Sequence, residues 1–200
     1  MSRCKVRVEP SALLLLAGFV LLSSPALLAA LLLAALCHEL GHYGMLRLFD
    51  GTVRELHLSL FGAEMRITGK MSYGQELWMT VAGPGINLLL AAVCHLLGRQ
   101  WEILYLFAGA QTVLGVFNLL PMKPLDGGSI LWIVVAYFTE PYLADRVVAT
   151  MGLVTALGLC AGAGYLFCRV GGTPFFLLAA LGLLRQALQE KGLVKCRKKR

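Results

Sequence analysis

Charged residues are scarce in this chain, because only 14% of its 200 residues are Asp, Glu, Lys or Arg. Disordered chains carry much more charge, so intrinsic disorder is excluded. The 22 glycines follow no fixed period, which excludes a collagen-like chain. Apolar residues are abundant instead: they make up 58% of the chain, and the mean hydropathy is +0.74. This excess excludes a soluble globular protein and indicates a polytopic membrane protein.

Closely paired cysteines are also missing. The six cysteines form no CxxC pair, and four of them lie in or at the edge of apolar segments. We therefore expect neither a disulfide framework nor a thiolate zinc site, and we interpret these cysteines as small packing residues.

Uncharged stretches of the chain predict the membrane spans. At about 20 residues per crossing, the apolar content suffices for roughly six helices. The first stretch, residues 10–37, is long for one helix, and the breaker Ser23-Ser24-Pro25 divides it into two crossings. The 13-residue stretch after Asp126 is too short to cross. We predict one all-α membrane domain over residues 1–200, with six transmembrane helices at 11–24, 26–47, 77–97, 103–121, 147–168 and 172–188.

One sizeable polar segment, residues 51–75, separates the second and third predicted spans. Within it, Leu56–Leu60 and Ala63–Ile67 alternate apolar with polar residues on either side of Gly62. Alternation with a period of two is typical of half-buried strands. We therefore predict a short β-hairpin at about 53–68, on the cytoplasmic side.

The end of the second span carries the sequence His38-Glu39-Leu40-Gly41-His42, an HExxH motif. Residues four apart share a helix face, so both imidazoles can reach one metal ion. Chance would produce this pattern in roughly 0.003 chains of this composition, so the motif is specific. The alternative is a pair of packed histidines with a structural Glu39. However, an ionisable group near mid-bilayer costs about 3 kcal/mol and requires a reason.

A catalytic zinc ion usually has three protein ligands, and carboxylates serve as the third. The candidate is Asp126, which ends the segment Asn118-Leu119-Leu120-Pro121-Met122-Lys123-Pro124-Leu125-Asp126 and precedes two glycines. Its two prolines break the fourth span, and such irregular backbone occurs at membrane depth only around a cavity or within protein. Spacing alone leaves two interpretations of Asp126 open, a metal ligand or a helix cap.

Three motifs together resemble the site-2 protease family of intramembrane zinc metalloproteases: the HELGH motif, Ala82-Gly83-Pro84-Gly85-Ile86-Asn87, and residues 118–128. The six-span layout is similar to the stage IV sporulation protein FB branch, without its CBS domain and without the PDZ insertions of other branches. The resemblance implies that His38, His42 and Asp126 bind one Zn²⁺ per chain and that Glu39 is the general base.

The implied function is a zinc-dependent intramembrane endopeptidase, which hydrolyses a peptide bond in or near a substrate's transmembrane segment. Its partners are then a transmembrane protein substrate and the lipid bilayer, and the sequence is compatible with regulatory membrane partners or a homo-oligomer. We interpret the basic C-terminus as a lipid-facing anchor and not as a nucleic-acid site. The alternative function is a non-catalytic metal-binding transporter or scaffold. Glu39 distinguishes the two functions, because a site that only binds a metal does not require a carboxylate that is not a ligand between its two histidines.

Two asparagines compete for the role of oxyanion donor. At 1.5 Å per residue, His38 and His42 lie ~18 and ~24 Å from the outer end of their span, and Asn118 lies ~22 Å from the outer end of the fourth. Asn87 lies nearer mid-membrane on the third span. Depth therefore favours Asn118 as the catalytic amide. Either asparagine could instead bond a broken helix end beside Pro84 or Pro121.

Basic residues predict the orientation of the chain. With both termini in the cytoplasm, 16 of the 18 Lys and Arg residues fall on the cytoplasmic side, and only Arg99 and Arg169 fall outside. In a cysteine-free background, we expect an impermeant thiol reagent to label Arg99→Cys but not Lys195→Cys in intact cells. Labelling at position 195 but not at 99 would overturn the orientation.

Overall fold

The computed structural model describes residues 5–8, 18, 20, 23–59, 62–68, 71–98, 101–170 and 174–197. The chain divides into two compact units, Met1–Leu119 and Leu120–Arg200. Each unit is described by itself below.

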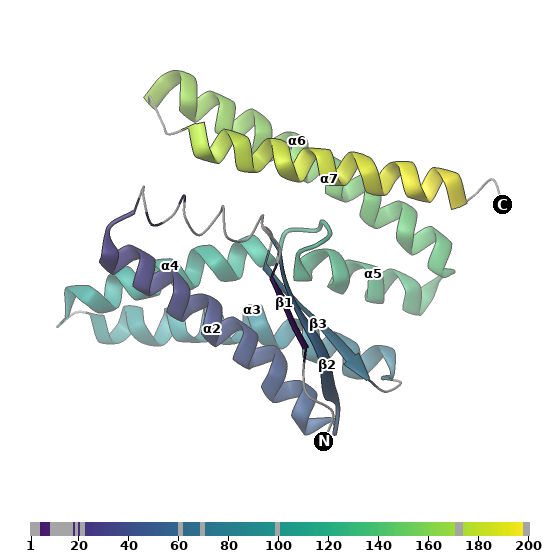
Figure 1. Ribbon diagram of the computed structural model, residues 1–200, viewed down its shortest axis with the longest axis horizontal. Helices are drawn as coiled ribbons and strands as arrows, with labels where there is room; N and C mark the ends of the chain where they lie inside the picture. The colour runs from purple at the N-terminus through teal and green to yellow at the C-terminus, as the bar shows by residue number, and fades with distance from the viewer. Residues whose placement is uncertain are drawn as a thin grey trace. The chain divides into compact units, whose positions relative to one another are not determined.

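Three helices form the body of the first unit: α2 (Pro25–Leu48), α3 (Tyr73–Leu97) and α4 (Glu102–Asn118). Each packs against the other two (Figure 1). Small side chains form the centre of the contact between α2 and α4, where Ala30, Ala34 and Ala110 are buried together. Small residues let helix backbones approach closely, which is how helices associate in an apolar solvent.

The start of α2 confirms the predicted helix break at Ser23-Ser24-Pro25. The Ser24 hydroxyl accepts a hydrogen bond from the Leu27 backbone amide at 3.3 Å, and Pro25 occupies the first helical turn. Serine at this position satisfies an otherwise unpaired amide, and proline there loses no helical bond. The start of α3 lies earlier than predicted, because Ser72 and Gln75 form a capping box and the helix begins at Tyr73.

A three-stranded sheet completes the first unit. The strand β2 (Thr52–Ser59) pairs antiparallel with β3 (Gly62–Thr68), in the register Thr52 to Thr68 and Ser59 to Gly62. Its other edge pairs in parallel with β1 (Lys5–Val8). The predicted hairpin segment thus lies on β2 and β3, with residues 60–61 outside the described part. The strand β1 lies before the first predicted span and was not predicted.

The second unit contains α5 (Asp126–Phe138), α6 (Pro141–Val170) and α7 (Pro174–Arg197). The helix α6 packs against both α5 and α7 (Figure 1). The Trp132 indole donates a hydrogen bond of 2.8 Å to Asp145, which links α5 to α6. The short α5 agrees with the expectation that the stretch after Asp126 does not cross a membrane.

Three helices of the described residues are long and apolar enough to cross a membrane, and these are α2, α3 and α6. They coincide with the second, third and fifth predicted spans. The helices α4 and α7 lie where the fourth and sixth spans were predicted, and α4 ends at Asn118 instead of 121. The first predicted span, 11–24, lies largely outside the described residues. A mostly helical chain is therefore confirmed, with three described helices that are long and apolar enough to cross a membrane, and the number of six spans stays a prediction.

The close approach of α2 and α3 depends on two glycines. A Cβ atom at Gly41 would lie 2.7 Å from the Ala82 carbonyl oxygen, and one at Gly83 would collide with the His42 imidazole. A Cβ at Gly85, two residues further along α3, would meet nothing within 4 Å. Gly83 therefore leaves the space that the His42 ring occupies.

We expect Gly83→Ala to destabilise the protein, because overpacking a tight contact costs about 1–3 kcal/mol. Gly85→Ala is the matched control and should be neutral or nearly so. The measurement is the thermal midpoint of unfolding of both variants in detergent. Equal midpoints for the two variants would contradict the assignment of this contact.

Candidate metal centre

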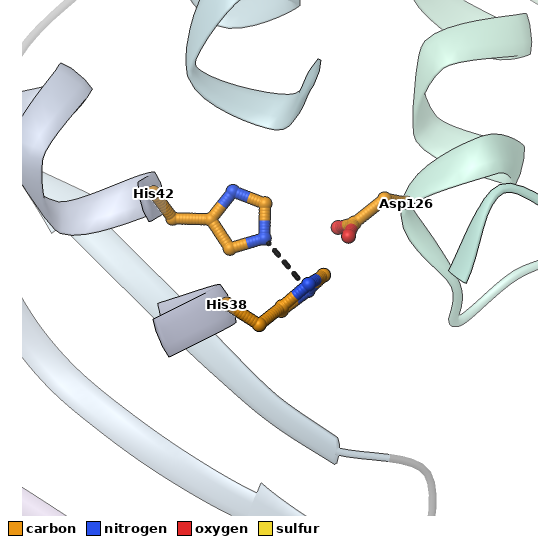
Figure 2. A group of neighbouring side chains, drawn as sticks. All are labelled: His38, His42 and Asp126. Carbon is orange, nitrogen blue, oxygen red and sulfur yellow. Dashed lines mark hydrogen bonds between the residues drawn. The ribbon is translucent and has the colours of Figure 1, made fainter. Parts of the chain in front are cut away.

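The two histidines of the HExxH motif lie on one face of α2, as their spacing predicts. Their Nε2 atoms are 3.1 Å apart and their rings are nearly perpendicular (Figure 2). His38 is 5% exposed, although histidine is seldom so buried without a specific role. The structure therefore brings the two predicted ligands together inside an apolar bundle.

A backbone contact orients the His42 ring. Its Nδ1 atom donates a hydrogen bond of 2.8 Å to the Met79 carbonyl oxygen on α3. Donation from Nδ1 leaves the lone pair of Nε2 directed toward His38, and metal-binding histidines are typically held in this way. Pro84 lies inside α3, where it has no N–H to donate to the Thr80 carbonyl one turn earlier.

The separation of the two nitrogens fits a shared metal ion. Two ligands that each lie about 2.0–2.1 Å from a tetrahedral zinc ion are about 3.3 Å from one another. The observed 3.1 Å between the Nε2 atoms is close to that value. The imidazole pair is thus already spaced for one ion.

Glu39 follows His38 directly on α2 and is half-buried. A carboxylate in this setting costs free energy unless it has a partner or a function. Successive helix residues point about 100° apart, so Glu39 does not share the exact face of His38 and His42. This is the placement expected of a base beside the metal ligands and not of a third ligand.

Asp126, the third residue labelled in Figure 2, belongs to the second unit and is the first residue of α5. Leu125 occupies the N-cap position, and no side chain makes a capping bond there. Asp126 thus lies one residue inside the helix start, and its role as a metal ligand or as a cap stays a prediction. The half-buried carboxylate stands in the first turn, where a helix favours negative charge.

The loop before Asp126 is held firmly within the second unit. Met122 and Leu125 are 0% and 1% exposed, and Met122 packs against Gly152 of α6. The loop also lies directly on Gly128, where a Cβ atom would collide with the Met122 backbone. Gly128 thus permits the close approach of this loop to the first turn of α5, next to Asp126.

The two candidate oxyanion donors differ in their bonding. The Asn118 amide donates a 3.1 Å hydrogen bond to the Leu114 carbonyl oxygen, within the last turn of α4. Asn87 is fully buried on α3, and neither its amide nitrogen nor its oxygen has a hydrogen-bond partner among the described residues. Sequence reasoning weighed both asparagines, but it did not find the Met79 carbonyl, because a backbone acceptor carries no residue signature.

Comparison with known proteins supports the resemblance that the motifs indicated. The family model described as Peptidase family M50 matches residues 97–159, a segment that includes Asn118 and Asp126. The stage IV sporulation protein FB of Bacillus subtilis is 26% identical over 196 residues, which cover 92% of this chain and 67% of that protein.

A second relative is the putative zinc metalloprotease sll0528 of Synechocystis, which is 29% identical over 78% of this chain. The chain spans 42% of the length of that relative. Among solved structures, the site-2 protease from Methanocaldococcus jannaschii matches with a TM-score of 0.70. The match covers 93% of this chain and 90% of that one at 22% identity, so it shows the shared fold. A segment of the chain therefore matches peptidase family M50, and the chain shares its fold with a site-2 protease.

Proposed function

We propose that this protein is a zinc-dependent intramembrane endopeptidase, which hydrolyses a peptide bond in or near a substrate's transmembrane segment. The observation that carries the proposal is the oriented HExxH pair, with Nε2 atoms 3.1 Å apart inside an apolar helix bundle. Relatives that are named zinc metalloproteases support it.

In the proposed site, His38, His42 and Asp126 bind one zinc ion per chain. Two imidazoles and one carboxylate are a donor set of catalytic zinc, which leaves a fourth position for water or substrate. When bound, zinc lowers the pKa of a coordinated water and polarises a carbonyl group. His42 keeps its Nε2 atom available because Nδ1 is engaged by the Met79 carbonyl.

Glu39 acts as the general base in this proposal. It takes a proton from the attacking water as the new bond to the scissile carbonyl carbon forms, and it returns the proton to the leaving amine. A half-buried carboxylate next to His38 on the same helix suits this role, because it is close to the proposed metal-bound water.

The substrate in this proposal is a transmembrane protein, and its helix must unwind locally before a peptide bond becomes accessible. The sheet of the first unit has two edges, β1 and β3, and either could pair with an extended segment. We also propose that both termini face the cytoplasm. Regulatory membrane partners or a second copy of the chain are compatible with this arrangement.

The first prediction concerns Glu39. We expect Glu39→Gln to keep the zinc content of the purified protein and to abolish proteolysis, because the amide cannot accept the proton. Ala substitutions at His38, His42 or Asp126 should instead lower the zinc content. Metal analysis of the purified variants measures the first effect.

Proteolysis can be measured without knowledge of the substrate. Quantitative proteomics of membrane-protein fragments would compare cells that contain the wild-type protein with cells that contain Glu39→Gln. Fragments that depend on Glu39 identify substrates, and purified candidates then provide a rate. Identical fragments in both cells, with full metal content, would favour the non-catalytic transporter or scaffold instead.

A second prediction tests whether Asn118 is an oxyanion donor or a structural residue. As an oxyanion donor, its loss in Asn118→Ala should lower turnover on the order of a hundredfold with zinc content and expression preserved, and Asn87→Ala should have a smaller effect. The matched control is Thr112→Ala, which removes the same kind of bond to a carbonyl four residues earlier in α4. If Asn118→Ala lost zinc or failed to accumulate in cells while Thr112→Ala did not, Asn118 would have a structural role instead.

A further inference from the structure

Two side-chain amides are buried in the bundle of the first unit without any bonding partner. Asn87 on α3 and Gln111 on α4 are both 0% exposed. Neither the nitrogen nor the oxygen of either amide has a hydrogen-bond partner in the part of the chain that the structure describes. Buried amides are nearly always bonded, so this pair requires an explanation.

The two amides lie close together along the contact between α3 and α4. A Cβ atom at Gly115 would lie 3.2 Å from the Asn87 Cβ atom, so Gly115 faces Asn87 directly. Gln111 precedes Gly115 by four residues and shares its helix face. The amides are therefore about one helical turn apart, or ~6 Å along the bundle axis.

The same contact continues toward the histidine pair. Gly83 adjoins His42, and Asn87 follows Gly83 by four residues on the same face of α3. A column of polar groups thus runs through the bundle, from His42 past Asn87 to Gln111.

Neighbouring polar side chains are satisfied locally, in contrast to these amides. The hydroxyls of Thr80 and Thr112 donate to carbonyls four residues earlier, each at 2.8 Å. Each primary amide offers two donors and an acceptor with two lone pairs. Because both amides are fully enclosed, a ligand must be small, and water is the polar ligand of that size.

We propose that Asn87 and Gln111 form an internal water-binding site in the bundle, next to the histidine pair. Two amides about one helical turn apart can together supply the two to four polar contacts that a buried water requires. The role of this site rests on the proposed function, because each turnover of the proposed hydrolysis consumes one water molecule inside an apolar bundle. Water held here is a local supply for that step.

The test is radiolytic footprinting of the full chain in lipid nanodiscs, with water itself as the probe. Hydroxyl radicals formed from bound water oxidise adjacent side chains, and mass spectrometry locates the products. The reporters are Phe107, four residues before Gln111, and Leu114, both packed against the buried alanines of the bundle. Phe117 near the end of α4 is the reference on the same helix.

We expect the oxidation of Phe107 and Leu114, relative to Phe117, to fall several-fold in Gln111→Leu and in Asn87→Leu. These changes keep the side-chain size and remove the polar atoms. The control Thr112→Val on the adjacent face should leave the oxidation unchanged. Zinc content should stay unchanged in Gln111→Leu, while its turnover on an identified substrate falls several-fold.

Oxidation that is the same in the wild type and in both leucine variants would overturn the proposal. An absence of oxidation at both reporters in the wild type would also overturn the proposal, because it would mean that no water lies beside the amides. This measurement is made on the wild-type protein and does not depend on the folding of a variant. The footprint does not depend on proteolysis. If Glu39→Gln shows that the protein is not a protease, the water site is still decided by oxidation, and only its role as a supply falls.

Discussion

The contact between α2 and α3 at His42 is the interaction on which the proposed chemistry depends. The Met79 carbonyl holds Nδ1, and the missing side chain of Gly83 leaves room for the ring. If either were lost, the imidazole could turn and the 3.1 Å pairing of the two Nε2 atoms would not be fixed. The site is thus prepared by helix packing before any ion binds, which lowers the ordering cost of binding.

In an apolar surrounding, each polar side chain of these helices raises the free energy of the folded state unless it is hydrogen-bonded. The polar side chains of the first unit are bonded in different ways. Thr80, Thr112 and Asn118 bond to carbonyls of their own helices, which needs no partner from elsewhere. His42 bonds across to another helix. A bond within one helix forms as soon as that helix folds, whereas the orientation of the His42 ring requires α3 to pack beside α2.

Much of the helical fold followed from hydropathy and breakers, because apolar runs and prolines act locally. The start of α2 at Pro25 is an example. The strand β1 could not be predicted, since it is four residues long and depends on pairing with β2, a segment far along the chain. Likewise, HExxH spacing predicted a shared helix face, but only tertiary packing shows that Met79 orients His42.

The support for the candidate residues comes from two independent sources. The family match covers residues 97–159, so it includes the loop before Asp126 but not the HExxH helix. The assignment of the histidine pair as metal ligands is supported by the 3.1 Å spacing of their Nε2 atoms and the burial of His38. These observations do not depend on the family model. Chance similarity in the loop would not place the buried His38 and the half-buried His42 at zinc spacing on α2. The family model covers the loop, and the alignment with the sporulation protein covers 92% of the chain and so includes the HExxH helix as well.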